Sequence, residues 1–138
     1  MPIMNWDQTL DIGVPAMNAD HRDILDVMNE IFDAHEAGKE GDSINRLVSR
    51  LGAVCTRHFA DEEAFMEKVG YPGLNSHKLI HKKLLEDFSG HAAAIKAAGG
   101  KVNEEFFGFL KRWLVAHIKG IDSKYAAHAN SSLSVATG

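Results

Sequence analysis

Apolar residues recur every three or four positions in four segments of the chain, and polar residues fill the positions between them. This spacing is typical of amphipathic α-helices that turn one face toward a core. No segment shows the alternation expected of a β-strand. Glycine, proline and capping residues mark the predicted helix boundaries, which are Asn18 or Asp20 to Gly38, Asp42 or Ser43 to Gly70, Asn75 or Ser76 to Gly99, and Phe106 to Gly120.

Short connections between these helices predict that consecutive helices run antiparallel. The predicted fold class is therefore all-α, an up-down-up-down four-helix bundle. Residues 1–17 are predicted to form an extended N-terminal arm, because Pro15 disfavours helix there, and Trp6 is predicted to anchor it. Residues 129–138 are small and polar, and are predicted to fray. We expect residues 1–138 to form one domain.

Composition narrows the range of functions. The chain has 138 residues, enough for one domain with a buried core. Its 15 basic and 19 acidic residues give a net charge of -4 without a basic run, so we expect no nucleic-acid partner. The chain contains no stretch of about 18 apolar residues, so we expect no membrane insertion. Its N-terminus does not resemble a signal peptide. Cys55 is the single cysteine, and we expect a cytoplasmic protein.

Histidines are unusually frequent, and five of the eight fall on the inward faces of the predicted helices. His58 and Glu62 are four residues apart, as are His77 and His81, so each pair points one way from its helix. In an antiparallel bundle, the starts of the first and third helices lie beside the ends of the second and fourth. All the candidates therefore fall near one end of the core, namely His21, His58, Glu62, His77, His81 and His117.

A buried cluster of this composition requires a partner. An unpaired buried charge costs several kcal/mol and an unpaired polar group roughly 1–3 kcal/mol. A lone histidine on an apolar face is more often a packed core residue than a ligand. That explanation does not suit five histidines at the same height in the bundle. Counting Asp122, two ions bridged by carboxylates would accommodate the whole set. Bridging carboxylates within a four-helix bundle favour iron.

Asp122 reaches such a cluster only if the helix is irregular. It lies five residues after His117, which in a regular helix is a rotation of about 500° and places it about 140° from the ligand face. The backbone must therefore widen or break between these residues. Gly120 is the residue best able to absorb the change, and a π-type turn is one solution.

The ordered set of motifs resembles the hemerythrin family in its single-domain bacterial form. The resemblance covers the chain from Trp6 to about Tyr125, and the "GYP" turn also fits it. A lone H-x-x-x-H would be weak evidence, whereas the full set in order is specific. The matching motifs are "NADHRDIL" around His21, "HFADE" from His58, "HKLIH" from His77 and "HIKGID" from His117.

This resemblance implies a pair of irons joined by an oxo or hydroxo bridge, with dioxygen as the ligand. Glu62 and Asp122 would bridge the two irons. The other ligands would divide between them, with His77, His81 and His117 on one iron and His21 and His58 on the other, which would stay open to dioxygen. Apolar residues beside the ligands match the oxygen pocket of the family, namely Ile24, Phe59, Trp113, Leu114 and Ile118.

Three classes of function remain open. The leading one is a protein without enzymatic activity that stores or transports oxygen, or delivers it to an oxidase or oxygenase. The second is an oxygen or redox sensor read by a partner protein, and the third is a di-iron oxidase or peroxidase. Ferritin-like oxidases carry more carboxylates and two Glu-x-x-His elements. The candidate site has five histidines and two acids instead, which favours reversible binding.

Other polar residues are given smaller roles. Glu63 points about 100° away from the ligand face and is predicted to be a surface acid or the partner of a ligand. His35 and His91 lie on the same helix faces as candidate ligands but at the far end of the bundle. We expect them to be solvated or at a helix end, and a second metal site there is the alternative. His128 falls in the tail that is predicted to fray. Cys55 is expected to be buried and unreactive.

Overall fold

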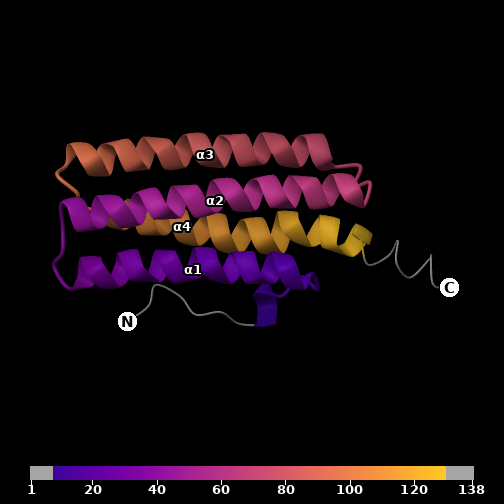
Figure 1. The fold of residues 1–138 in the computed structure, drawn as a ribbon, viewed down its shortest axis with the longest axis horizontal. Coiled ribbons are helices and arrows are strands. Elements are labelled where there is room, and N and C mark those ends of the chain that lie inside the picture. Colours follow the sequence, from indigo (N-terminus) through magenta and orange to yellow (C-terminus); the bar gives the residue numbers. More distant parts are fainter. Residues whose placement is uncertain (1–7, 130–138) are drawn as a thin grey trace.

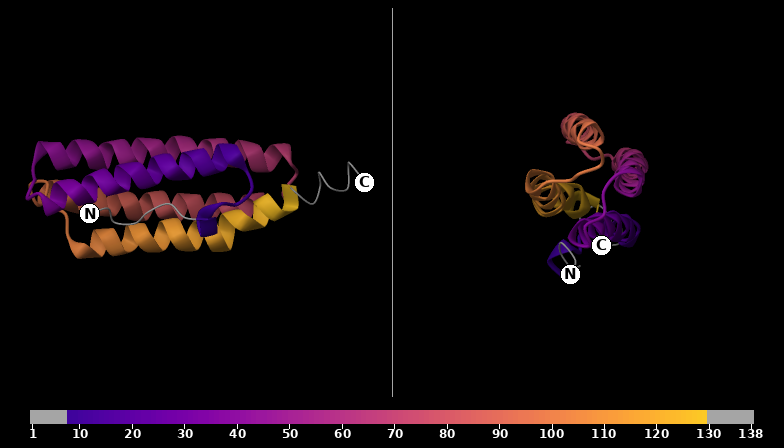
Figure 2. Two further views of the ribbon diagram at one scale, coloured as in Figure 1. Left: turned by 90° about the horizontal axis from the view of Figure 1, so that it is seen from below. Right: turned by 90° about the vertical axis from the view of Figure 1, so that its left-hand side faces the viewer.

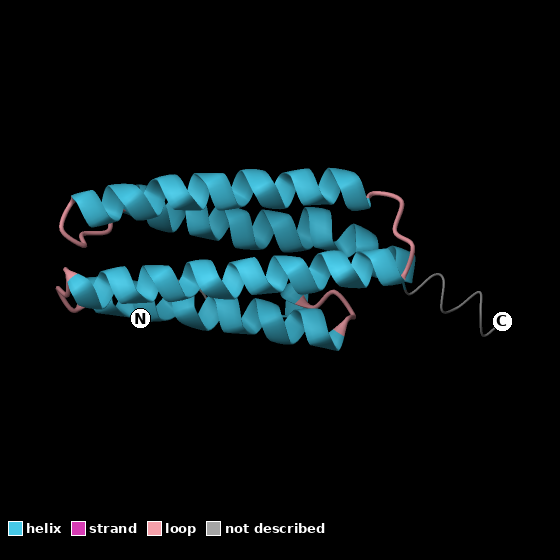
Figure 3. Ribbon diagram, turned by 45° about the horizontal axis from the view of Figure 1, so that its top comes forward, coloured by secondary structure: helices cyan, strands magenta, loops and turns pink. Residues whose placement is uncertain are grey.

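A computed structural model of the chain describes residues 8–129, and residues 1–7 and 130–138 lie outside this description. Helices and connecting loops make up the whole described range (Figure 3). Residues 123–129 continue as helix after the last named element. The elements are the 3-10 helix η1 (Gln8–Leu10), α1 (Pro15–Glu36), α2 (Asp42–Lys68), α3 (Leu74–Ala97), α4 (Glu104–Ala116) and the π-helix η2 (His117–Asp122).

The four long helices run alternately up and down (Figure 1) and surround a common core when the bundle is seen end-on (Figure 2). This confirms the predicted all-α bundle. α2 packs closely along both α1 and α3, whereas α4 approaches α1 at fewer points and α3 at fewer still. No helix in residues 8–129 is long and apolar enough to cross a membrane. The fully buried centre includes Ile24, Met28, Ile31, Leu51, Phe106 and Leu110.

Glycines end the first two helices near the predicted positions. Gly38 has a φ of 77° and Gly70 a φ of 65°, in the left-handed region that favours glycine. The residue after each glycine donates its backbone N–H to the carbonyl five positions earlier, at 2.9 Å in both cases. These bonds satisfy carbonyls that the end of a helix leaves without partners. Short loops therefore reverse the chain and set the antiparallel order.

The start of α1 differs from the prediction. The helix begins at Pro15, so Asn18 and Asp20 lie inside it and do not cap it. Proline is favoured at the first helical position, because its φ is already helical and no N–H is needed there. The arm is accordingly shorter than residues 1–17. Asn18 instead accepts a 3.1 Å hydrogen bond from the N–H of Ile12, which ties the arm to the helix.

Leu10 fixes the described part of the arm. Its side chain is 1% exposed and belongs to the main core cluster, and η1 lies against η2. Trp6, the predicted anchor, lies outside the described residues. The arm therefore reaches the end of the bundle where the histidines gather.

The C-terminal segment is ordered further than predicted. Residues 130–138 of the predicted tail lie outside the described range, but Ala129 is helical and 4% exposed. The placement of His128 in a frayed tail is wrong. It lies in the same helical segment, and its Nε2–H donates a 3.0 Å hydrogen bond to the carbonyl of Val69. This bond crosses to the end of α2 and holds the segment in place.

Candidate metal centre

The structure brings all seven candidate ligands together at one end of the bundle. This is the end where α1 and α3 begin and where α2 and η2 end (Figure 1). Every member is between 0% and 6% exposed, although all are polar or charged. The cluster consists of His21, His58, Glu62, His77, His81, His117 and Asp122.

A widened turn places Asp122 in the cluster. The segment from His117 to Asp122 is π-helical, as the spacing of these two residues requires. A π-helix rotates less per residue than an α-helix, so a five-residue step returns to nearly the same face. Asp122 Oδ1 consequently lies 2.8 Å from His117 Nε2. Gly120 lies within this π-helical segment and does so without a left-handed φ, and the widening extends over six residues.

The two oxygens of Glu62 face different histidines. Its Oε1 lies 2.8 Å from Nε2 of His81 and 2.9 Å from Nε2 of His77. Its Oε2 lies 2.9 Å from Nε2 of His58, one turn earlier in α2. One carboxylate therefore connects ring nitrogens on α2 with ring nitrogens on α3.

Asp122 repeats this division. Its Oδ1 lies 2.8 Å from Nε2 of His117 and 3.1 Å from Nε2 of His77. Its Oδ2 lies 3.1 Å from Nε2 of His21. The seven residues thus form two groups that share both carboxylates, one of Glu62, His77, His81, His117 and Asp122, and one of His21, His58, Glu62 and Asp122.

Two further carboxylates contact the far sides of histidine rings. Asp20 Oδ2 lies 3.0 Å from Nδ1 of His58, and Glu63 Oε2 lies 3.0 Å from Nδ1 of His81. Each contact favours a proton on Nδ1 and leaves Nε2 free to act as a ligand. Glu63 is therefore the partner of a candidate ligand, one of its two predicted roles. Asp20 was expected only as a cap, and its position next to His21 was the available signal.

Tyr125 is a contributor that the sequence interpretation missed. Its hydroxyl donates a 3.0 Å hydrogen bond to Oε2 of Glu62, and its side chain is 0% exposed. Burial, reinforced by the charge of Glu62, raises the pKa of Tyr125 above its usual value, so the hydroxyl keeps its proton and remains a donor. The bond joins residues 63 positions apart, and helical spacing carries no information about such a contact.

The neighbouring histidine rings favour the ionised form of both candidate bridging carboxylates, Glu62 and Asp122. Burial would raise the pKa of Asp122, but the neighbouring rings, led by His117, lower it to about 2. The same balance holds the pKa of Glu62 well below its usual value. Burial would lower the pKa of His117, but contact with the two carboxylates raises it to about 9. Every described ion pair of these carboxylates is with a histidine.

The geometry fits cations better than a network of hydrogen bonds. Both oxygens of Asp122 and the Nε2 atoms of His21 and His58 are buried without a well-aligned hydrogen bond in the described structure, despite their short contacts. Nε2 of His77 faces Nε2 of His117 at 3.2 Å. Ligand atoms held about 2.1 Å from one metal at right angles lie about 3.0 Å apart. The observed spacings suit nitrogen and oxygen atoms that share metal ions.

An apolar hollow borders the smaller group, and its side chains are packed too closely to leave room for a water molecule. Its wall includes His21 and His58 of the smaller group, together with His117 of the larger group and the shared Asp122. His77 and His81 are not part of the wall, so the hollow lies on one side of the cluster. The titratable groups among its lining residues are candidate ligands themselves. The five apolar residues that were expected around an oxygen pocket all line this hollow, namely Ile24, Phe59, Trp113, Leu114 and Ile118.

The histidines at the far end of the bundle have apolar neighbours. The ring of His35 lies 5.4 Å from that of Phe107, and the ring of His91 lies 4.7 Å from that of Phe109. Neither histidine belongs to a group of three or more potential ligands within residues 8–129. The alternative of a second metal site at this end therefore has no support in the described structure.

Known proteins share both the sequence and the fold. Residues 12–129 match the hemerythrin HHE cation binding domain. The chain is 33% identical over 129 residues to a bacteriohemerythrin of Pseudomonas aeruginosa, covering 94% of this chain and 83% of that protein. It is 31% identical over 120 residues to a myohemerythrin of Theromyzon tessulatum, covering 87% of this chain and 88% of that protein. A crystal structure of a hemerythrin mutant matches with a TM-score of 0.84 at 27% identity, covering 94% of this chain and 98% of that one. The chain therefore belongs to the hemerythrin family.

Proposed function

We propose that this protein binds dioxygen reversibly at two iron ions and serves oxygen storage, transport or delivery. The observation that carries the proposal is the division of the oxygens of Glu62 and Asp122 between two histidine groups. Each carboxylate would bridge the two ions. Membership in the hemerythrin family and a ligand set of imidazoles and carboxylates favour iron as the metal.

The two groups differ in a way that would leave one ion open. The larger group would hold one iron through three histidines, whereas the smaller group has only His21 and His58 besides the shared carboxylates. The apolar hollow borders this smaller group. Once bound, the irons would supply the electrons that oxygen binding requires. The chain itself would supply a position for oxygen and the surroundings of that position.

Residues around the ligands would keep this arrangement rigid and dry. Asp20 and Glu63 orient two rings, and Tyr125 holds one oxygen of Glu62. Apolar side chains cover the open side of the cluster and exclude water. The hollow is not lined by any titratable residue other than candidate ligands within the described range, so a separate proton donor for oxidase chemistry is missing there. This favours reversible binding, with an oxidase or oxygenase as a suitable recipient.

The decisive experiment is recovery of oxygen from the iron-loaded protein. Metal analysis and Mössbauer spectroscopy should first find two coupled irons per chain. The anaerobically reduced protein should then be nearly colourless, develop a visible absorption band when oxygen is added, and lose the band under vacuum with release of the oxygen.

Two other outcomes would contradict the proposal. Continuous oxygen consumption in the presence of a reductant, without recoverable oxygen, would identify an oxidase. Immediate oxidation without any oxygenated form would favour a redox sensor. In either case the di-iron assignment would be judged separately, from the metal analysis.

A further inference from the structure

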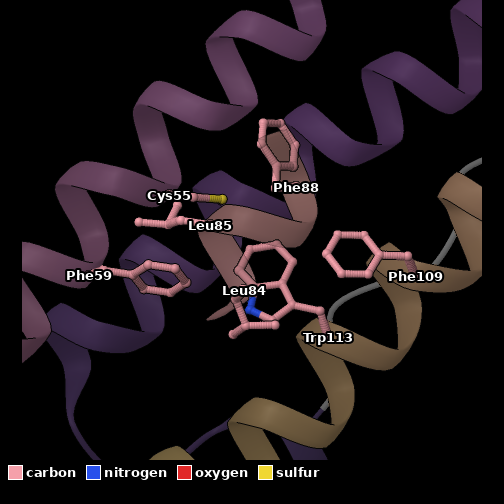
Figure 4. Close-up of a pocket in the computed structure, with 7 residues that line it drawn as sticks. All are labelled: Cys55, Phe59, Leu84, Leu85, Phe88, Phe109 and Trp113. Carbon is pink, nitrogen blue, oxygen red and sulfur yellow. The ribbon is translucent and has the colours of Figure 1, made fainter. Parts of the chain in front are cut away.

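A second hollow lies beside the metal centre, between α2, α3 and α4 (Figure 4). The space in it that can hold the centre of a water-sized molecule is about 10 Å³, which is room for one small molecule, and no polar atom is exposed on its wall. A water molecule needs two to four polar partners, so cavities of this kind stay dry and take up small apolar molecules. The lining residues are Cys55, Phe59, Leu84, Leu85, Phe88, Phe109 and Trp113.

The thiol of Cys55 forms part of this apolar wall. The side chain is 3% exposed, and burial raises the pKa of the thiol above its usual value. It therefore keeps its proton and behaves as a small apolar group. No charged or strongly polar group of the described lining would compete with an apolar guest.

The cavity adjoins the loosest side of the bundle. Leu84, Leu85 and Phe88 of α3 are only half-buried, and α3 packs less extensively against α4 than against α2. A surface groove on this side shares Leu84, Phe109 and Trp113 with the cavity. Half-buried apolar side chains therefore line the cavity on this side.

Two aromatic rings separate the cavity from the oxygen pocket. Phe59 and Trp113 line both spaces, and their ring centroids lie 5.9 Å apart in an edge-to-face arrangement. Phe59 stacks on the ring of His81 at 4.0 Å, which holds it in place. The indole nitrogen of Trp113 is buried and has no hydrogen-bond partner in the described structure. Packing alone, without a hydrogen bond from its indole nitrogen in the described structure, therefore holds Trp113 in the partition.

We propose that this cavity binds one molecule of a small apolar gas and is the antechamber between the α3–α4 groove and the oxygen pocket. The gas is dioxygen if the function proposed above holds, and only that identification rests on it. Groove, cavity and pocket adjoin one another, because Trp113 lines all three and His117 lines both the groove and the pocket. The cavity admits oxygen while offering no hydrogen-bonding partners to water, in contrast to the groove, which Arg112 and His117 also line.

Xenon tests the cavity without involving the irons. In ¹²⁹Xe NMR, the wild-type protein should show one saturable site. Leu84→Phe should fill the cavity and abolish that site, whereas Cys55→Ala should enlarge it and strengthen binding. Leu47→Phe is the matched control, because Leu47 is a half-buried residue of α2 that lines neither the cavity, the groove nor the pocket. Absence of a xenon site in the wild type, or an unchanged site in Leu84→Phe, would overturn the proposal.

Stopped-flow mixing with oxygen tests the passage. In Leu84→Phe, the rates at which oxygen reaches and leaves the reduced protein should both fall, by about tenfold, with the equilibrium affinity unchanged, because a blocked route slows both directions equally. Leu47→Phe should match the wild type. Unchanged rates in Leu84→Phe would refute the role as antechamber. If wild-type oxygen binding proved irreversible, the proposed function would fail, while a slower oxidation of reduced Leu84→Phe would still support the passage.

Discussion

Removing the hydroxyl of Tyr125 tests the geometry around Glu62. The hydroxyl donates a 3.0 Å hydrogen bond to a carboxylate oxygen that is fully buried. Hydrogen bonds to charged groups contribute about 1.5–3 kcal/mol, so Tyr125→Phe should lower the free energy of unfolding of the metal-free protein by about that amount. For a chain of this size each kcal/mol changes Tm by about 3–5 °C, which predicts a decrease of about 5–15 °C.

Urea denaturation of the metal-free protein measures this loss directly, as a shift of the midpoint with an unchanged slope. Tyr71→Phe is the matched control. Tyr71 is the other tyrosine of the chain, and its hydroxyl makes no hydrogen bond within the described structure. That variant should stay within about 0.5 kcal/mol of the wild type. Equal stability of the two variants would refute the bond between Tyr125 and Glu62.

The same variant bears on the metal centre. The bond goes to Oε2 of Glu62, the oxygen that faces His58 in the smaller group. A hydrogen bond withdraws electron density from a ligand oxygen, so its loss should make the carboxylate a stronger donor. Iron-loaded Tyr125→Phe should therefore have a lower reduction potential than the wild type, measured by redox titration. A potential equal to that of iron-loaded Tyr71→Phe would contradict this reasoning.

Three other properties can be tested in the same way. His81→Ala should lower the iron content, because it removes a nitrogen from the larger ligand group, whereas His91→Ala should retain full iron by metal analysis. Ile118→Ser should leave initial oxygen binding intact but accelerate decay of the oxygenated form several-fold, because water gains access to the pocket. Stopped-flow spectra measure this decay, and an unchanged rate would contradict the shielding role of Ile118. In the metal-free protein, the stabilising contribution of His117 is complete below its ordinary pKa of 6.5 and is lost as the pH rises through about 9. That of Asp122 is complete above its ordinary pKa of 3.8 and is lost as the pH falls toward about 2. Thermal melts should therefore show the highest metal-free Tm between about pH 4 and 6.5, and a Tm that stays constant up to pH 9 would refute this.

Helical periodicity predicted the parts of the site that depend on one helix at a time. The four-residue steps from His58 to Glu62 and from His77 to His81 predicted which faces turn inward. Antiparallel order then predicted that these faces meet at one end. The five-residue step to Asp122 indicated a widened backbone, because a regular α-helix could not bring that carboxylate to the cluster, and η2 is that widened segment.

Contacts between helices were beyond the reach of such reasoning. Tyr125 and Asp20 meet their partners across 63 and 38 positions, and no spacing within one helix encodes those distances. The local error at Pro15 has another cause. Proline interrupts the interior of a helix but is favoured at the first helical position, and at Pro15 the second effect applies.

The π-helical segment also determines where the chain tolerates a change of length. His117 and Asp122 lie on one helix face at a spacing of five residues, whereas His58 and Glu62 do so at a spacing of four. Deleting one residue among 118–121 would let this turn relax to an ordinary α-helix and still leave the histidine and the aspartate on one face. Tyr125 would remain three residues beyond the aspartate. The same deletion within α2 or α3 would rotate one ligand of a pair by about 100° away from its partner. The segment is thus a point at which an engineered chain can lose a residue and still keep the candidate ligands on one face.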